Sequence, residues 1–194
     1  MEKLTRDNLY SLEQYAAMRP EYRKRVMAHK KERVIPVGPN ASFHFEDRFT
    51  MQYQVQEMLR AERIFEAAGI QDELDVYNPL IPDGSNWKVT FMIEFPDEEE
   101  RRRELARMHG IEERCWVCVE GFDPVFAIAD EDLERDNEEK TSSVHFLRFE
   151  LNANMASAAK AGAAISVGID HDAYRHQENP LSDHHRASLA ADLA

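Results

Sequence analysis

The sequence predicts an α+β fold in a single domain, with a largely antiparallel sheet and helices packed mainly on one side of it. Residues 87–95 alternate apolar and polar side chains with the period of two that marks a half-buried strand. Residues 46–69 are instead rich in good helix formers. The predicted strands are not separated by regular crossover helices, which favours antiparallel pairing. We place the domain at residues 1–174 and expect residues 175–194 to form a polar tail, either frayed or folded into an appended helix.

The N-terminal part of the chain is predicted to hold two short helices. Thr5 is a suitable N-cap for a helix over residues 5–18. Pro20 suits the first turn of a second helix over residues 20–33. Two short extended segments follow this second helix. They cover residues 34–40 and 42–45.

The helix predicted over residues 46–69 is the longest in the chain, and Gly69 is a plausible residue to end it. Its apolar side chains recur at helical spacing, so we expect them to pack on the sheet. They are Met51, Val55, Met58 and Phe65. Glu62 lies near the middle of this stripe. A carboxylate there is costly unless it is paired, protonated or bound to a metal ion.

The second half of the chain is predicted to supply most of the sheet. One antiparallel sheet should contain the strands at residues 87–95, 115–120, 125–129, 143–151 and 163–170. Helices over residues 97–109 and 154–161 connect these strands, and Gly110 and Gly162 follow the two helices.

The charge of the chain argues against two classes of partner. A formal net charge of −13 opposes binding to nucleic acid or to an anionic membrane, because both favour a basic surface. The charge is nevertheless uneven, since residues 19–33 are mainly basic and residues 130–140 mainly acidic. These segments are either two solvated stretches or docking patches for another protein.

The N-terminal sequence and the number of cysteines both favour a cytoplasmic location. The N-terminal residues lack the apolar core of a signal peptide, and no apolar run approaches the length of about 18 residues that crosses a membrane. Cys115 and Cys118 cannot form a disulfide framework, so we expect a cytoplasmic protein. Because they are three residues apart on a predicted strand, the two thiols should point to opposite faces and serve structural roles.

Two histidines lie in the apolar phase of predicted strands. His145 shares its phase with Leu147 and Phe149, and His171 ends a strand. Together with Glu62 they match, by residue type, the two-histidine and one-carboxylate set that binds non-haem iron. A divalent metal such as iron is therefore one interpretation, with Arg148 orienting an anionic substrate. The alternative is a hydrogen-bonded network in which Glu62 accepts from a histidine or an arginine and no metal is bound.

Several motifs resemble a bacterial family catalogued as domain of unknown function 3501. They are QEMLRAER at residues 56–63, YNPLIP at 77–82, Glu134-Arg135, KTSSVHFLRF at 140–149 and HDAY at 171–174. The resemblance runs from about residue 4 to residue 174. Residues of these motifs are the candidates for contact with a substrate or partner. They are Glu57, Arg135, Arg148 and Tyr174.

The resemblance implies no established activity. Family members are often encoded near rubrerythrin-like proteins and iron–sulfur oxidoreductases, which implies iron, peroxide or electron-transfer physiology. Three functions remain open. The chain could be an accessory or binding protein of such a redox or peroxide-detoxifying system. It could also be a metal-dependent enzyme of the non-haem iron type that acts on a small anionic substrate, or a small-molecule sensor.

Overall fold

The computed structural model describes residues 2–129 and 141–194 and confirms the α+β class. Within these residues the strands form two antiparallel sheets of four strands each. Sheet A has the order β1 (Val34–Pro36), β2 (Ala41–Glu46), β3 (Asn86–Ile93) and β6 (Val144–Glu150). Sheet B has the order β5 (Val125–Phe126), β4 (Cys115–Val119), β7 (Ile165–His171) and β8 (Tyr174–Glu178).

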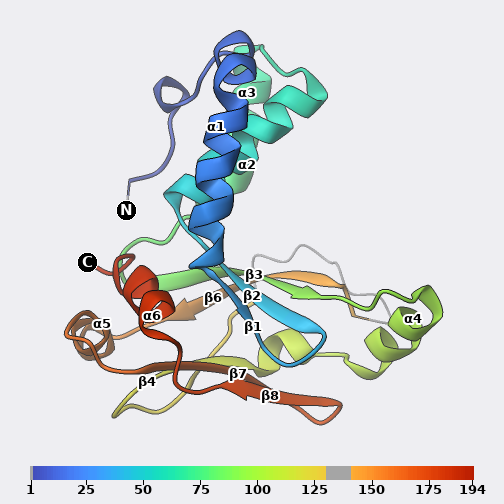
Figure 1. The fold of residues 1–194 in the computed structure, drawn as a ribbon, viewed down its shortest axis with the longest axis vertical. Coiled ribbons are helices and arrows are strands. Elements are labelled where there is room, and N and C mark those ends of the chain that lie inside the picture. Colours follow the sequence, from blue (N-terminus) through green and yellow to red (C-terminus); the bar gives the residue numbers. More distant parts are fainter. Residues whose placement is uncertain (1, 130–140) are drawn as a thin grey trace.

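The two sheets lie one above the other and enclose one apolar core (Figure 1). Phe43, Trp87 and Phe149 of sheet A belong to the same buried cluster as Val117 and Val167 of sheet B. The alternation that predicted the strand at residues 87–95 is confirmed, because the aromatic and β-branched side chains of β3 enter this core.

The prediction of one sheet is wrong, because the expected strands are divided between two. β3 pairs with β2 and β6, whereas β4 pairs with β5 and β7. A strand in either arrangement buries one face and therefore shows the same period of two. Pairing depends on contacts between residues far apart in the chain, which periodicity does not report.

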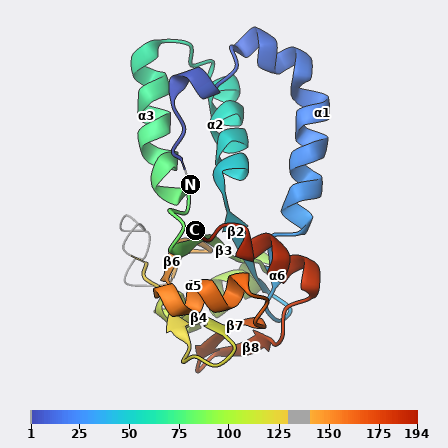
Figure 2. The same ribbon diagram turned by 90° about the vertical axis from the view of Figure 1, so that its left-hand side faces the viewer.

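Three helices of the described chain form a projection that stands on sheet A, on the side away from sheet B, and we call it the arm (Figures 1 and 2). It contains α1 (Leu12–Lys31), α2 (Arg48–Glu62) and α3 (Ala67–Tyr77), with short 3-10 turns at Arg6–Asn8 and Asn78–Leu80. The arm is held by two apolar clusters of its own, separate from the core between the sheets.

The helix break expected near Pro20 is absent from this part of the described chain. α1 begins after the N-cap Ser11, whose side chain accepts a hydrogen bond from the Gln14 amide, and it runs through Pro20. A proline inside a helix costs about 3 kcal/mol relative to alanine. Tyr15 and Tyr22 are both buried against α2 on either side of Pro20. Packing therefore outweighs the local preference of the proline.

The single helix expected over residues 46–69 is in fact two helices. The chain leaves α2 at Arg63, which has the left-handed values φ 57° and ψ 40°. Met51 and Val55 are buried as expected, but in a cluster of the arm, and Met58 is only partly buried. The prediction for Phe65 is wrong, because the turn at Arg63 takes it out of the helical register and leaves it 71% exposed.

The remaining helices close the ends of the sandwich. α4 (Glu98–Arg107) lies at one end, while α5 (Ala153–Lys160) and α6 (Asp183–Ala190) lie together at the other (Figure 1). The helices predicted over residues 97–109 and 154–161 are thus confirmed. Gly110 and Gly162 both take positive φ values, of 77° and 101°. None of the helices in the described residues combines the length and the apolar composition needed to cross a membrane.

The segment at residues 175–194 contains an appended helix, one of the two forms that we expected for it. It completes β8 and then forms α6, whose Leu189 is fully buried. The Leu189 carbonyl accepts a hydrogen bond of 2.9 Å from the buried Trp87 indole. Leu181 and Leu193 are also buried, so three leucines spaced along a polar segment anchor it to the core.

Candidate functional site

α1 and α2 are joined by a charged and hydrogen-bonded contact around Glu57. Two of the guanidinium nitrogens of Arg19, Nε and Nη2, each donate to the Glu57 carboxylate at 2.7 Å. The Tyr15 hydroxyl donates to Oε1 of the same carboxylate at 2.7 Å. The Arg19 hydrogen bonds lower the pKa of Glu57 to about 2, against the opposing effect of burial. Burial and the adjacent carboxylate raise the pKa of Tyr15. Glu57 was predicted to contact a substrate or partner. In the structure both of its carboxylate oxygens instead accept hydrogen bonds from residues of α1.

The turn between α2 and α3 forms the tip of the arm. Ile64 packs against Gly69 so closely that a Cβ at position 69 would lie 2.8 Å from the Ile64 methyl group. Gly69 therefore has a packing role inside α3 in place of the predicted helix-ending one. The next residue in the turn, Phe65, is left with most of its ring in solvent.

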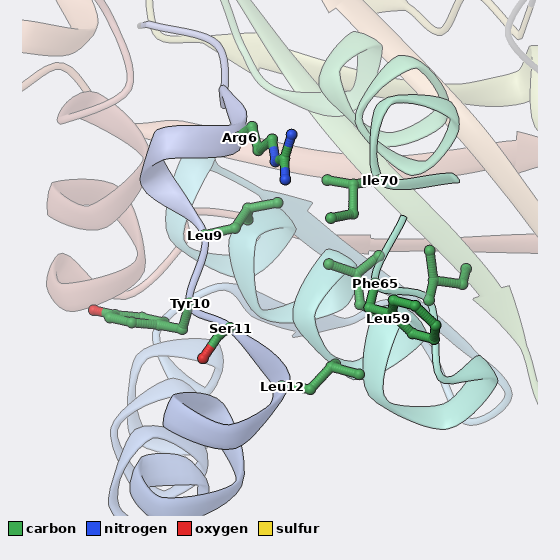
Figure 3. Close-up of a pocket in the computed structure, with 9 residues that line it drawn as sticks. Arg6, Leu9, Tyr10, Ser11, Leu12, Leu59, Phe65 and Ile70 are labelled. Carbon is green, nitrogen blue, oxygen red and sulfur yellow. The ribbon is translucent and has the colours of Figure 1, made fainter. Parts of the chain in front are cut away.

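An apolar pocket of about 270 Å³ opens beside this turn. Figure 3 shows Leu9 and Leu12 of the N-terminal segment on one side and Leu59, Phe65 and Ile70 on the other. The rest of the lining is Arg6, Tyr10, Ser11 and Ile64. The pocket has apolar walls, and the arginine, the tyrosine and the serine are its polar side chains. This is the composition expected of a site that receives an apolar group.

The flank of the arm formed by α1 is positively charged. Arg23, Lys24, Arg25 and Lys31 are all exposed on this helix. Among the residues that the structure describes, none of these four forms an ion pair. The basic segment at residues 19–33 is therefore a surface of the arm, apart from Arg19 and Arg33, which bind inside the protein. The acidic segment at residues 130–140 lies outside the described residues, as does Arg135.

Arg33 joins the arm to the sandwich. Its guanidinium is 2% exposed and donates to the Phe45 carbonyl at 2.9 Å and to the Asp192 carboxylate. His29 and Arg33 also face Asp47, whose other oxygen caps α2 through the Thr50 amide. Burial opposes ionisation of Asp47, yet the His29 hydrogen bond and the Arg33 charge lower its pKa below the usual value. Burial raises the pKa of Asp192 to about 6 in spite of Arg33.

The predicted metal ligands lie in three separate parts of the fold. Glu62 is exposed at the end of α2, His145 is buried on β6 and His171 ends β7. Across residues 2–129 and 141–194, no group of three or more His, Cys, Asp or Glu side chains could hold a metal ion. The structure therefore does not bring Glu62, His145 and His171 together into the predicted set.

Both histidines have hydrogen-bond partners. The predicted phase of His145 is confirmed, since its side chain is buried with Leu147 and Phe149. Its Nε2 faces the Ser142 carbonyl at 3.0 Å and the Thr141 hydroxyl at 3.1 Å. Nδ1 of His171 accepts from the Ala173 amide at 3.1 Å, so its Nε2 carries the proton and donates to the His109 carbonyl at 3.0 Å. Both histidines thus have structural partners, and Glu62 takes no part in these contacts.

Arg148 and Tyr174, which were also predicted to contact a substrate or partner, lie on strands β6 and β8. Arg148 occupies the opposite phase of β6 from His145, as predicted, and donates to Glu150 at 2.5 Å. Tyr174 is buried, and its hydroxyl donates to the Val37 carbonyl at 2.8 Å and accepts from the Asn40 amide at 3.0 Å. The tyrosine thus satisfies backbone groups in the turn between β1 and β2.

The cysteines behave as their spacing predicts. Cys115 is buried, whereas Cys118 is partly exposed on the opposite face of β4, and both are free thiols. Burial raises the pKa of both thiols. A low-pKa redox pair needs the reverse shift, so the environment of these cysteines is that of structural residues.

The pocket at the tip is a feature that the sequence patterns did not predict. The signal that could have found its rim is the pair Ile64-Phe65, which stands between the charged residues Arg63 and Glu66. A continuous helix over residues 46–69 would instead direct Phe65 towards the sheet. Leu9 and Leu12 come from a distant segment, and no local pattern connects them to the turn.

A solved structure that resembles this one comes from Burkholderia pseudomallei K96243 and is described as a novel protein of unknown function. The two chains are 52% identical, cover 100% of each other and superpose with a TM-score of 0.94. No curated protein matches the chain. The model of the family described as "Protein of unknown function (DUF3501)" matches residues 3–193. The chain therefore belongs to the DUF3501 family, as its motifs predicted.

Proposed function

We propose that the protein is a binding or accessory protein that docks a partner protein through the tip of its arm. The observation that carries this proposal is the apolar pocket at the tip, with Phe65 71% exposed at its rim. A pocket lined mainly by apolar side chains, with a largely exposed phenylalanine beside it, is a feature of protein interaction sites. The arm projects from the sheets, so a large partner can reach its tip without meeting the sandwich (Figure 2).

The size of the pocket favours an amino-acid side chain as its occupant. Its volume of about 270 Å³ lies below the range of about 300–1,000 Å³ that is usual for small-molecule sites. Larger hollows of about 630 and 390 Å³ lie on sheet B, where a small ligand would have more room than at the tip of the arm. An aromatic or large aliphatic side chain of the partner would fill the pocket beside Phe65 and remove that ring from water.

The charge of the arm indicates what surrounds that side chain. Arg6 lines the pocket, and the exposed cations of α1 continue along the same arm. An acidic surface on the partner would complement them and would speed encounter more than it would strengthen the complex. We therefore propose a partner whose apolar anchor residue is flanked by acidic residues.

The resemblance supplies candidates for this partner. Because family members are often encoded near iron–sulfur oxidoreductases and rubrerythrin-like proteins, we propose one of these two classes as the partner. The role is then accessory to an iron-dependent redox or peroxide-detoxifying system. A non-haem iron enzyme is the less favoured alternative, because its ligand atoms must meet a common point at about 2.0–2.2 Å and no described group of side chains can hold a metal ion.

Direct binding of purified proteins tests the proposal. The full-length chain is titrated by calorimetry with the rubrerythrin-like protein and with the iron–sulfur oxidoreductase encoded beside a family member. We expect one of them to bind and Phe65→Ser to weaken that binding about 30-fold, the loss typical of a hot-spot residue. Phe126→Ser is the matched control, because Phe126 is an exposed phenylalanine on sheet B, which lies on the far side of sheet A from the arm.

Two outcomes would contradict the proposal. One is that neither protein binds the wild-type chain at concentrations up to about 100 μM, weaker than ordinary specific complexes. The other is that Phe65→Ser and Phe126→Ser weaken binding equally. Loss of folding is not a concern for the first variant, since exposed positions usually change stability by less than about 0.5 kcal/mol.

A further inference from the structure

Two buried donors near the base of the arm have no hydrogen-bond partner among the residues that the structure describes. They are the hydroxyl of Tyr22 and the Nε of Arg48. Tyr22 is 4% exposed on α1, and Arg48 is the first residue of α2. Buried polar groups in native proteins are nearly always paired, so two orphans in one region indicate a ligand or an ordered water.

The two orphans share one aromatic cluster. The ring of Phe49, which follows Arg48 in the chain, packs against the Tyr22 ring with centroids 5.5 Å apart. Arg25, one turn after Tyr22 on α1, holds its guanidinium carbon 5.7 Å from the centre of the same Phe49 ring. Tyr22 and Arg25 therefore both contact the Phe49 ring at the contact between α1 and α2, and Arg48 is the residue next to Phe49 in the chain.

The region is positively charged. Within the described part of the chain, neither Arg25 nor Arg48 forms an ion pair. Both charges act on the Tyr22 hydroxyl: burial raises its pKa to about 12, and the two guanidinium groups oppose that rise. Asp47, the carboxylate that precedes Arg48 in the sequence, is already engaged by His29 and Arg33.

We infer that Tyr22, Arg25 and Arg48 form a binding site for a phosphate-type oxyanion. Guanidinium groups bind such anions through planar, charge-assisted hydrogen bonds, and a hydroxyl supplies a third donor. Two unpaired cations match the charge of a phosphate better than that of a carboxylate. Both orphaned atoms are closed to solvent, while Arg25 is exposed.

This inference does not depend on the docking proposal. The site lies at the contact between α1 and α2 near the start of α2, whereas the pocket lies at the turn that follows the end of α2. The residues of the oxyanion site do not line the pocket. The Tyr22 ring does contact Tyr10 of the pocket lining, with centroids 6.1 Å apart, but Tyr22→Phe keeps that ring in place.

Calorimetric titration of the full-length protein with inorganic phosphate tests the site, with total ionic strength held constant by sodium chloride. We expect saturable 1:1 binding and at least a tenfold rise in Kd for Arg25→Gln and for Arg48→Gln. Tyr22→Phe keeps the aromatic packing and removes only the hydroxyl, so it should fold normally and raise Kd at least threefold. Arg23→Gln with Lys24→Gln is the matched control, because both residues are exposed cations of α1 outside the aromatic cluster.

Four outcomes would overturn the inference. Phosphate could fail to bind below about 10 mM, which means that ordered water satisfies the orphaned donors. The control variant could weaken binding as much as Arg48→Gln, which would reveal general electrostatic attraction. Tyr22→Phe could leave Kd unchanged, which would exclude the hydroxyl. Tighter binding of acetate than of phosphate would overturn the assignment of the anion.

Discussion

The sandwich and the arm are stabilised by different interactions. The sandwich encloses one apolar cluster that draws on both sheets, and its buried tryptophan and most of its phenylalanines lie deep inside it. The arm has two small clusters, and it relies on tyrosines, on the contact of Arg19 with Glu57 and on the joint at Arg33. Apolar burial is non-directional, whereas these polar contacts require fixed geometry.

This difference explains where the candidate sites lie. Both the apolar pocket and the orphaned donors belong to the arm, whose small clusters leave apolar surface uncovered and polar atoms unpaired. Elements with few buried apolar contacts are also the ones that open first and adapt to partners.

Among the single substitutions, Arg33→Ala at the joint between arm and sandwich should have the largest effect. It leaves the Asp192 carboxylate buried without its partner, and breaking a buried ion pair in this way costs about 3–5 kcal/mol. Urea unfolding of the variant measures the loss. Arg23→Ala, an exposed change on α1, is the control. A loss below about 1 kcal/mol would mean that the arm does not depend on this joint.

The second prediction concerns how the stability of the protein depends on pH through Asp192. Its pKa in the folded protein is about 6, against a usual value of 3.8, so the folded state binds the proton more tightly than the unfolded state. The resulting stabilisation is complete below about pH 3.8 and is lost as the pH rises through 6, by about 2–3 kcal/mol.

Unfolding curves of wild type and Asp192→Asn between about pH 4 and pH 7 check this sign. Relative to the variant, the wild type should lose stability as the pH rises. Asp183→Asn is the control, because Asp183 is fully exposed at the start of α6. A difference between wild type and Asp192→Asn that stays constant with pH would show that Asp192 titrates normally.

Pro20 offers a test of packing against local preference. Pro20→Ala should restore the missing backbone hydrogen bond inside α1 and stabilise the arm by about 2 kcal/mol, after a partial offset from the more flexible unfolded chain. Amide hydrogen exchange should show slower opening of α1 and α2 with unchanged exchange in β3 and β7. An equal slowing in all four elements would show that the arm and the sandwich unfold as one unit.

The smallest expected effect is at Glu57. Its pKa of about 2 in the folded protein lies below the usual 4.5, so the stabilisation is present above pH 4.5 and disappears as the pH falls towards 2. Because the contact is partly exposed to solvent, we expect Glu57→Gln to cost only about 1 kcal/mol at pH 7. Glu62→Gln, on the exposed end of the same helix, should cost nothing measurable. If both variants lost the same free energy of unfolding, the contact between Arg19 and Glu57 would not stabilise the arm.

Local patterns in the sequence were enough for much of the secondary structure. Asp97 caps α4 and Asn152 caps α5, and the alternation of β3 and β6 correctly directed Trp87 and His145 inward. These features depend on residues within one turn or one strand, so a single sequence carries their signal.

Contacts between distant residues decided the rest. The division of the strands into two sheets, the passage of α1 through Pro20 and the anchoring of α6 to Trp87 each depend on such contacts. Glu62, His145 and His171 lie apart for the same reason, because a local phase says nothing about whether side chains meet, and the inward phase predicted for Glu62 is itself wrong.

The sequence by itself determined the fold class, the family and the inward or outward face of most strand residues, because these follow from composition, motifs and a period of two. Only the tertiary structure decided where the apolar pocket lies. One left-handed residue, Arg63, turned Phe65 out of the predicted core and into the rim of a pocket. Ile64 of that turn packs on Gly69, and the pocket is completed by a separate N-terminal segment that no local pattern connects to the turn.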